Sequence, residues 1–415
     1  MLRSLITSLC LTAILISYHP AAKAVEPVTA DRLRETLNGR SLQKKQRLLD
    51  GLMQVREFNE TQTRALAESV QSFLASPNEP TPADLQTLYL LQRGTPEAAS
   101  PSLIAGLRHS DPRVVQLSLD GVKFHTPATA FDQLTGLVTH KTFSQRYGFR
   151  RAVIDAVAAY RTPAAVGFLI EQLPAFDGQL EYVAVLHLQQ LTGQTITNSA
   201  EDWKTWWASV APEDRGPPSG EAVPQQDTPS LKGQWNGPLP KFYDIPIFAK
   251  KVVFIIDNSA SMLSRQDGET RSERAQKELS EAIEAMAPDV EFNIIAYNHL
   301  VDFWNRSLLP ASVAAKSSAV QYTYALSPFG KTASYEALSL GLSFDPNTEL
   351  VVFLSDGKPT AGSLVEPLSI LHAIWKQNLF QKTTIDTLGI DTVGETEEFM
   401  EYLAEQNYGA YTKIR

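Results

Sequence analysis

Two aspartates in the second half of the sequence each end an apolar run that is typical of a buried strand. Asp257 ends the run VVFIID and Asp356 ends the run ELVVFLSD. Continuous apolar runs of this length predict strands of a parallel sheet that is covered on both faces. Since ligands of such sheets bind at the carboxyl ends of the strands, we expect both carboxylates to be exposed at the same edge.

Three hydroxyl side chains accompany these aspartates. Ser259 and Ser261 stand two and four residues after Asp257, and Thr332 lies in a Gly-Lys-Thr segment between the two runs. Donors that are all oxygen select a hard cation, Mg²⁺ first with Mn²⁺ or Ca²⁺ as alternatives, and the lack of histidine and cysteine argues against zinc. Two carboxylates balance the metal charge, so such a site can still accept one anionic oxygen from an Asp or Glu of a protein partner.

The elements that must position these residues alternate between strands and helices. We expect strands at 252–257, 290–297, 301–304, 349–356, 384–390 and 411–414, and helices near 271–287, 333–343, 365–378 and 395–406. This alternation predicts right-handed crossovers and a doubly wound, mostly parallel α/β sheet in the C-terminal part of the chain.

Three segments, VVFIIDNSASM, GKTASYEAL and VVFLSDGKPT, resemble in order and spacing the von Willebrand factor type A domain, which has a Rossmann-like sheet. The resemblance extends over about residues 245–415. In that family, a metal-ion-dependent adhesion site combines Asp-x-Ser-x-Ser with a Thr and an Asp on two further loops. The corresponding residues are Asp257, Ser259, Ser261, Thr332 and Asp356. The resemblance implies that the serines, and often the threonine, contact the metal directly, that the aspartates act through water, and that the domain binds proteins rather than catalysing a reaction.

The sequence departs from the family pattern at two positions. Ala260 stands where the family often has Gly, and Lys331 replaces the second Gly of a Gly-Gly-Thr. Ala260 is small and should be harmless. A lysine in this loop either is simply solvated, weakens metal binding, or helps to hold an acidic ligand.

Two other functions have to be weighed. The segment ALSPFGKT at 325–332 nearly matches a P-loop, which would make the protein a nucleotide hydrolase. It has a single Gly and a Pro, however, whereas a P-loop needs a glycine-rich loop after a buried strand. The other alternative is a structural module with an unoccupied metal site. None of the seven histidines lies near Asp257 or Asp356 in the sequence, and no catalytic motif is present, so we expect no enzymatic activity.

The N-terminal part, residues 25–210, shows the apolar spacing of successive helices and predicts an all-α helical-repeat region. Thr-Pro pairs at 81, 95, 126 and 162 predict helix starts, with Thr as N-cap and Pro at the first helical position. The turn at Asp111-Pro112 resembles that of HEAT repeats, which suggests a second interaction surface. Trp203, Trp206 and Trp207 are expected to cap the helical stack, or alternatively to form a carbohydrate or peptide platform.

Residues 211–240 contain seven prolines and four glycines, which predicts a linker between the helical part and a domain at 241–415. We therefore expect limited proteolysis in this segment to release two parts that fold independently.

Residues 1–24 have the pattern of a signal peptide, with a basic start, an apolar run and Ala22-Lys23-Ala24 before the cleavage site. The sequence thus predicts an exported protein, periplasmic or extracellular and bacterial, without a transmembrane span after cleavage. The only cysteine, Cys10, would be removed, so no disulfide could form. A net charge of −9 argues against nucleic acid as a partner.

Overall fold

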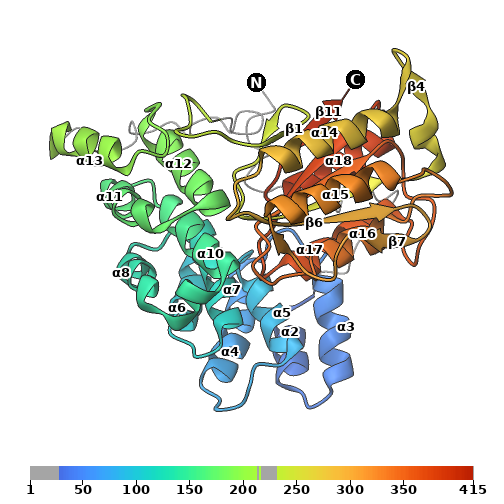
Figure 1. The fold of residues 1–415 in the computed structure, drawn as a ribbon. Coiled ribbons are helices and arrows are strands. Elements are labelled where there is room, and N and C mark those ends of the chain that lie inside the picture. The colour runs from blue at the N-terminus through green and yellow to red at the C-terminus, as the bar shows by residue number, and fades with distance from the viewer. Residues whose placement is uncertain (1–27, 213–214, 216–230, 415) are drawn as a thin grey trace.

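The structure, a computed structural model, describes residues 28–212, 215 and 231–414, and places a helical part beside an α/β part (Figure 1). The expected signal peptide at 1–24 and half of the expected linker lie outside the described residues. No helix in the described ranges is long and apolar enough to cross a membrane.

The N-terminal part is entirely helical. Its α-helices are α2 (Ala30–Asn38), α3 (Leu42–Leu52), α4 (Glu60–Leu74), α5 (Pro82–Leu91), α6 (Pro96–Gly106), α7 (Pro112–His125), α8 (Phe131–Gly136), α9 (Lys141–Gln145), α10 (Tyr147–Ala158), α11 (Pro163–Gln172), α12 (Gly178–Thr192) and α13 (Ala200–Ser209). Sequence neighbours pack as pairs, such as α4 with α5, α6 with α7 and α11 with α12.

Three of the four Thr-Pro pairs begin helices as predicted. Thr81 and Thr162 cap α5 and α11 with their side chains, and Thr95 precedes α6 without a side-chain cap bond. The prediction is wrong for Thr126, which ends α7 in a left-handed conformation with φ of 42°. Because Thr126 closes one helix there, α8 starts only at Phe131, after a 3₁₀ turn.

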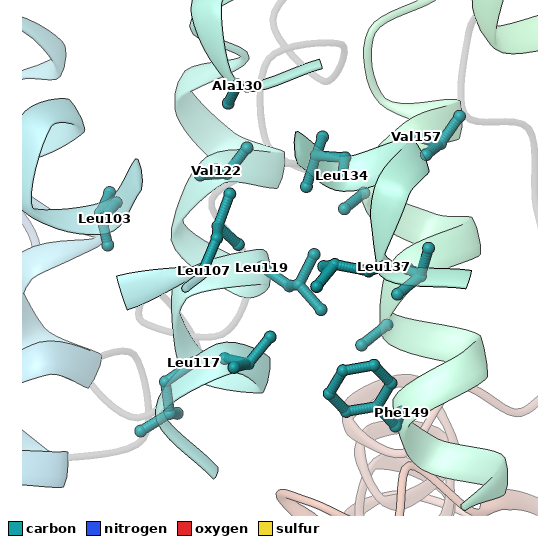
Figure 2. Close-up of a cluster of buried hydrophobic side chains, with 14 of the residues drawn as sticks. Leu103, Leu107, Leu117, Leu119, Val122, Ala130, Leu134, Leu137, Phe149 and Val157 are labelled. Carbon is teal, nitrogen blue, oxygen red and sulfur yellow. The ribbon is translucent and has the colours of Figure 1, made fainter. Parts of the chain in front are cut away.

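Leucine and valine side chains between consecutive helices form the core of this part (Figure 2). Leu107, directly after α6, lies beside Leu119 of α7, with Leu134 of α8 and Phe149 of α10 beyond it, whereas Leu103 of α6 lies on the other side of α7. Core packing thus continues from one helical pair to the next.

The helix α13 is fixed to the end of the helical stack. Trp203 is fully buried there, and its Nε1 donates a hydrogen bond to the Thr197 carbonyl at 2.7 Å. Trp206 and Trp207 are half-buried, and the guanidinium of Arg215 lies over the Trp207 ring. These contacts fit the capping interpretation of the three tryptophans.

A sheet in the order β11-β10-β9-β3-β6-β7, with β8 on β6, forms the centre of the C-terminal part. Its strands are β3 (Lys251–Asp257), β6 (Glu291–Tyr297), β7 (Val301–Phe303), β8 (Leu309–Pro310), β9 (Leu350–Ser355), β10 (Thr384–Ile390) and β11 (Tyr411–Ile414). Only β7 and β8 run antiparallel, which confirms the mostly parallel fold class. Two small hairpins, β1 (Lys241–Phe242) with β2 (Ile245–Pro246) and β4 (Arg265–Gln266) with β5 (Glu269–Thr270), lie outside the sheet.

Helices cover both faces of this sheet. One face packs against α14 (Arg271–Ala285) and α15 (Val313–Ala325), and the other against α16 (Ser334–Gly341), α17 (Pro367–Asn378) and α18 (Glu395–Gln406). The predicted elements of this part are confirmed. The helix α15, the strand β8 and the two small hairpins were not predicted.

The helical part packs against the amino ends of the strands (Figure 1). Arg151 of α10 donates to Thr384 Oγ1 at the start of β10 at 2.7 Å, and the Gln179 N–H of α12 donates to Glu349 Oε2 at 3.0 Å. Trp375, in the last turn of α17, and Phe380, just beyond this helix, pack against the core of the helical part rather than against the sheet. This shared core does not fit the expectation of two independent parts.

Candidate metal-binding site

The predicted aspartates do meet at one edge of the sheet. Asp257 ends β3 and Asp356 directly follows β9, the strand beside it. Ser261, four residues after Asp257, donates its hydroxyl to Asp356 Oδ1 at 2.7 Å. The fold therefore joins the aspartate–serine loop and the Asp356 loop through side chains that the sequence proposed as ligands.

The expectation that both carboxylates are exposed is wrong, because the Asp356 side chain is fully buried and so is the Asp257 carboxylate. Its Oδ1 accepts the Ser259 N–H at 2.9 Å, and its Oδ2 accepts the hydroxyls of Ser355 at 2.7 Å and Tyr297 at 3.3 Å. Burial, together with the charge of Asp356, raises the pKa of Asp257 to about 6. A carboxylate with this pKa gains most from a neighbouring positive charge, which favours its ionised form.

The two serine hydroxyls lie side by side in front of these carboxylates. Ser259 Oγ is 2.9 Å from Ser261 Oγ, which in turn is 2.7 Å from Asp356 Oδ1. Adjacent oxygens around an octahedral Mg²⁺ with bonds of about 2.1 Å are roughly 3 Å apart. The oxygens of Ser259, Ser261 and Asp356 therefore have the chemistry and the spacing of neighbouring ligands around one Mg²⁺ ion, so these residues fit the implied metal.

Thr332 lies in the loop between α15 and α16, next to both other loops. The Ala260 N–H donates to the Gly330 carbonyl at 3.2 Å, and Thr332 and Thr360 exchange two hydrogen bonds of 2.9 and 3.1 Å. Thr332 is buried, whereas its neighbour Lys331 is exposed. Backbone bonds thus fix the threonine loop against the loops that follow β3 and β9.

Arg271, which the sequence analysis did not single out, neutralises part of the site. This first residue of α14 donates to Asp356 Oδ2 at 2.8 Å and to Asp391 Oδ2 at 2.9 Å. Asp391 directly follows β10, so the rule that found Asp257 and Asp356, an aspartate after a buried strand, would also have found Asp391. Asp356 therefore presents one oxygen to Arg271 and the other to Ser261.

The described residues form neither a metal site of three or more His, Cys, Asp or Glu side chains nor a P-loop. Within the described residues, no three His, Cys, Asp or Glu side chains cluster as metal ligands, and the aspartate–serine site has two carboxylates. The fold brings His299 to the Thr332 loop, where its ring contacts Phe329 at 5.4 Å. The segment 325–332 joins two helices rather than a strand and a helix, which does not fit a P-loop.

Residues 252–358 match the family model of the von Willebrand factor type A domain, which commonly mediates interactions between proteins. The match begins in β3 and ends just after Asp356, so it includes all five proposed ligands.

Curated relatives align with a similar share of the chain. Inter-alpha-trypsin inhibitor heavy chain H2 is 29% identical over 181 residues in Sus scrofa and 28% over 180 residues in Mesocricetus auratus. Heavy chain H4 of Homo sapiens is 26% identical over 176 residues. Each alignment covers 40% of this chain and 18% of the relative, so the chain spans less than a fifth of the length of these relatives.

Two solved structures are also similar. A von Willebrand factor type A protein from Catenulispora acidiphila is 21% identical with a TM-score of 0.36, covering 41% of this chain and 40% of that chain. An aerotolerance-related membrane protein from Bacteroides fragilis is 18% identical with a TM-score of 0.32, covering 40% and 90%.

Proposed function

We propose that the C-terminal domain binds Mg²⁺ through Asp257, Ser259, Ser261, Thr332 and Asp356, and through it a carboxylate of a protein partner. The observation that carries the proposal is the row of oxygens from Ser259, Ser261 and Asp356 at 2.9 and 2.7 Å. The metal would supply a positive charge for the partner's carboxylate. The chain's own residues hold the ion and leave one coordination position open for the partner's carboxylate. The proposed role is therefore binding and not catalysis.

The orientation of the two parts supports an adaptor role. Helical residues contact Glu349 and Thr384 at the amino ends of β9 and β10, whereas the candidate ligands follow the carboxyl ends of the strands. The site thus points away from the helical part. We propose that the helices form HEAT-like repeats and a second interaction surface that can be occupied at the same time.

The proposed location follows from the sequence alone. A signal peptide at 1–24 would export the protein from a bacterial cell to the periplasm or beyond. Expression of the full chain followed by N-terminal sequencing of the exported form tests this part: a new N-terminus at Val25 supports it, and an intact Met1 in the cytoplasm contradicts it.

Isothermal titration calorimetry of the full chain tests the metal site. Ser261 is exposed, so Ser261→Ala should leave the fold intact and weaken Mg²⁺ binding at least tenfold. Ser317→Ala, at an exposed position of α15, is the matched control and should bind as the native chain does. Equal affinity in the native chain and Ser261→Ala contradicts the ligand assignment, and no heat at millimolar Mg²⁺ favours the structural module.

A further inference from the structure

Exposed apolar side chains surround the candidate metal site. Among the described residues, eleven large apolar side chains are exposed. Four of them lie in the segments that follow β3, β6, β9 and β10, and a fifth lies in the loop between α15 and α16 that carries Thr332. These five, the apolar ring, are Leu263 (54% exposed), Leu300 (62%), Phe329 (50%), Val365 (47%) and Val393 (70%). The other six are distributed over helices, an edge strand and a loop elsewhere in the chain.

Two members of the ring are attached to the aspartate–serine loop itself. Leu263 ends the 3₁₀ helix that begins at Ala260 and contains Ser261. The backbone N–H of Phe329 donates to the Asn258 carbonyl at 3.0 Å, which places the Phe329 loop against the same segment. Leu263 is thus two residues from Ser261 in the sequence, and the Phe329 loop is held against the segment that carries both serines.

The remaining members flank the other loops of the site. Leu300 is in the turn after β6, where the Asn298 carbonyl accepts the N–H of Ala333, the residue after Thr332. Val393 comes two residues after Asp391, the second partner of Arg271. Val365 belongs to segment 357–366, which joins Asp356 to α17. Each of the loops around the site thus contributes one exposed apolar side chain.

We propose that the apolar ring is the docking surface for a protein partner whose metal-binding Asp or Glu is flanked by large apolar side chains. The inference rests on the proposed function and names the partner's chemistry. Exposed apolar groups gathered at one face of a protein mark an interaction site, and their burial drives association. Binding hot spots in protein interfaces are commonly enclosed by neighbouring side chains that exclude water, and the apolar ring would enclose the carboxylate–metal contact in this way.

The charges of these loops favour an acidic segment over other occupants. Lys331 and Lys358 are exposed, and they stand one and two residues from Thr332 and Asp356. If a second copy docked here by two-fold symmetry, the lysines and the metal of one copy would face those of the other, and these positive charges would repel each other. A carboxylate between apolar neighbours satisfies both the lysines and the ring.

A phage-displayed library of random twelve-residue peptides, selected on the full chain in Mg²⁺, supplies the probe. We expect the enriched peptides to share an Asp or Glu with Leu, Ile, Phe, Tyr or Trp next to it. The most enriched peptide is then synthesised and titrated against the native chain with Mg²⁺ and with chelator. A peptide in which Asn or Gln replaces the acidic residue should bind at least tenfold more weakly.

The test of the ring is the double variant Leu300→Ser with Phe329→Ser. It should weaken peptide binding at least tenfold while Mg²⁺ affinity stays unchanged, because neither side chain is a proposed ligand. The matched control, Leu42→Ser with Phe124→Ser, removes equally exposed apolar side chains in the helical part and should bind the peptide normally.

The outcomes separate this inference from the proposed function. A chelator-sensitive peptide that binds the ring variant normally overturns the ring and keeps the metal function. A peptide that the ring variant loses but that binds equally well with chelator keeps the ring and overturns the metal function. Three results would overturn the proposed partner. These are the absence of any enriched peptide, dimers in sedimentation that the ring variant does not form, and binding to phosphatidylserine vesicles that the ring variant loses.

Discussion

Lys382 Nζ lies 2.8 and 3.0 Å from the two carboxylate oxygens of Asp120, a residue 262 positions earlier in the chain. Lys382 is 2% exposed and also donates to the Tyr408 hydroxyl at 3.1 Å. Burial alone would lower the pKa of Lys382, but the charge of Asp120 and the interactions with Tyr408 together outweigh burial, and the pKa is raised. This ion pair, between α7 and the segment before β10, joins the helical part to the sheet.

Asp120→Ala should therefore lower the free energy of unfolding of the full chain by about 3 kcal/mol, since it leaves a buried ammonium group without its counter-ion. Urea denaturation measures this change. The control is Asp289→Ala, which breaks the exposed pair of Lys250 and Asp289 and should cost less than about 1 kcal/mol. A loss equal to that of the control would contradict a stabilising interface.

Cutting the chain between the two parts should not separate them. We would introduce a specific protease site into segment 216–230, and after cleavage the two fragments should elute together from a sizing column. Close packing holds the two parts together in addition to the ion pair. The backbone at Gly148 approaches the carbonyls of Phe380 and Gln381 so closely that a Cβ at this position would clash with them.

The same cut in the Asp120→Ala background provides the contrast, since it weakens the interface without changing the cleavage site. There the fragments should dissociate at lower urea concentration. Separation of the native fragments in buffer alone would restore the idea of two independent parts.

Glu349 makes the interface sensitive to pH. It accepts N–H groups of Gln179 and Lys250 at 3.0 and 2.9 Å, and burial raises its pKa to about 7. A carboxyl group whose pKa is higher in the folded state than in the unfolded state stabilises the fold at low pH, and this contribution is lost as the pH rises through about 7. The other charged groups near it include Asp177 and Arg150.

Glu349→Gln keeps an oxygen for both N–H groups and removes the titration. Between pH 5 and pH 8, the native chain should lose about 2 kcal/mol of stability relative to this variant. Parallel urea titrations of both proteins at the two pH values measure the difference. Identical pH profiles would show that Glu349 has an ordinary pKa in the folded chain.

The elements around the site are predictable because their signals are local. The predicted strands at 384–390 and 411–414 and the helix at 395–406 agree with the structure to the residue. An apolar run followed by Asp identified the correct edge of the sheet for both Asp257 and Asp356. The burial of Asp257 was not predictable, since it depends on Tyr297 and Ser355 from two neighbouring strands.

What the sequence analysis missed depends on distant partners or on weak patterns. The helix α15 is VAAKSSAVQYTYA, whose small and polar residues show no apolar stripe, and only Ala319 and Thr323 are buried. The pair of Asp120 and Lys382 links two residues that look like ordinary surface charges in the sequence. The link between the two parts therefore could not be inferred from composition, which showed only a segment rich in proline.

The threonine loop depends on a glycine whose replacement should weaken metal binding. Gly330 has φ of +76°, and a Cβ at this position would clash with the ring of His299. Gly330→Ala should cost about 1–2 kcal/mol for the left-handed backbone alone, and the clash should displace Thr332, two residues further on. We expect Mg²⁺ affinity, measured by calorimetry, to fall about tenfold.

Two further variants separate the backbone cost from the clash. Gly237 has φ of +108° with open space at its Cβ position, so Gly237→Ala should cost similar stability and leave Mg²⁺ affinity unchanged. Adding His299→Ala to Gly330→Ala removes the clash and should restore most of the metal affinity, while the backbone cost remains. If Gly330→Ala binds Mg²⁺ as tightly as the native chain, the position of the Thr332 loop does not determine metal binding, and Thr332 would be removed from the ligand set.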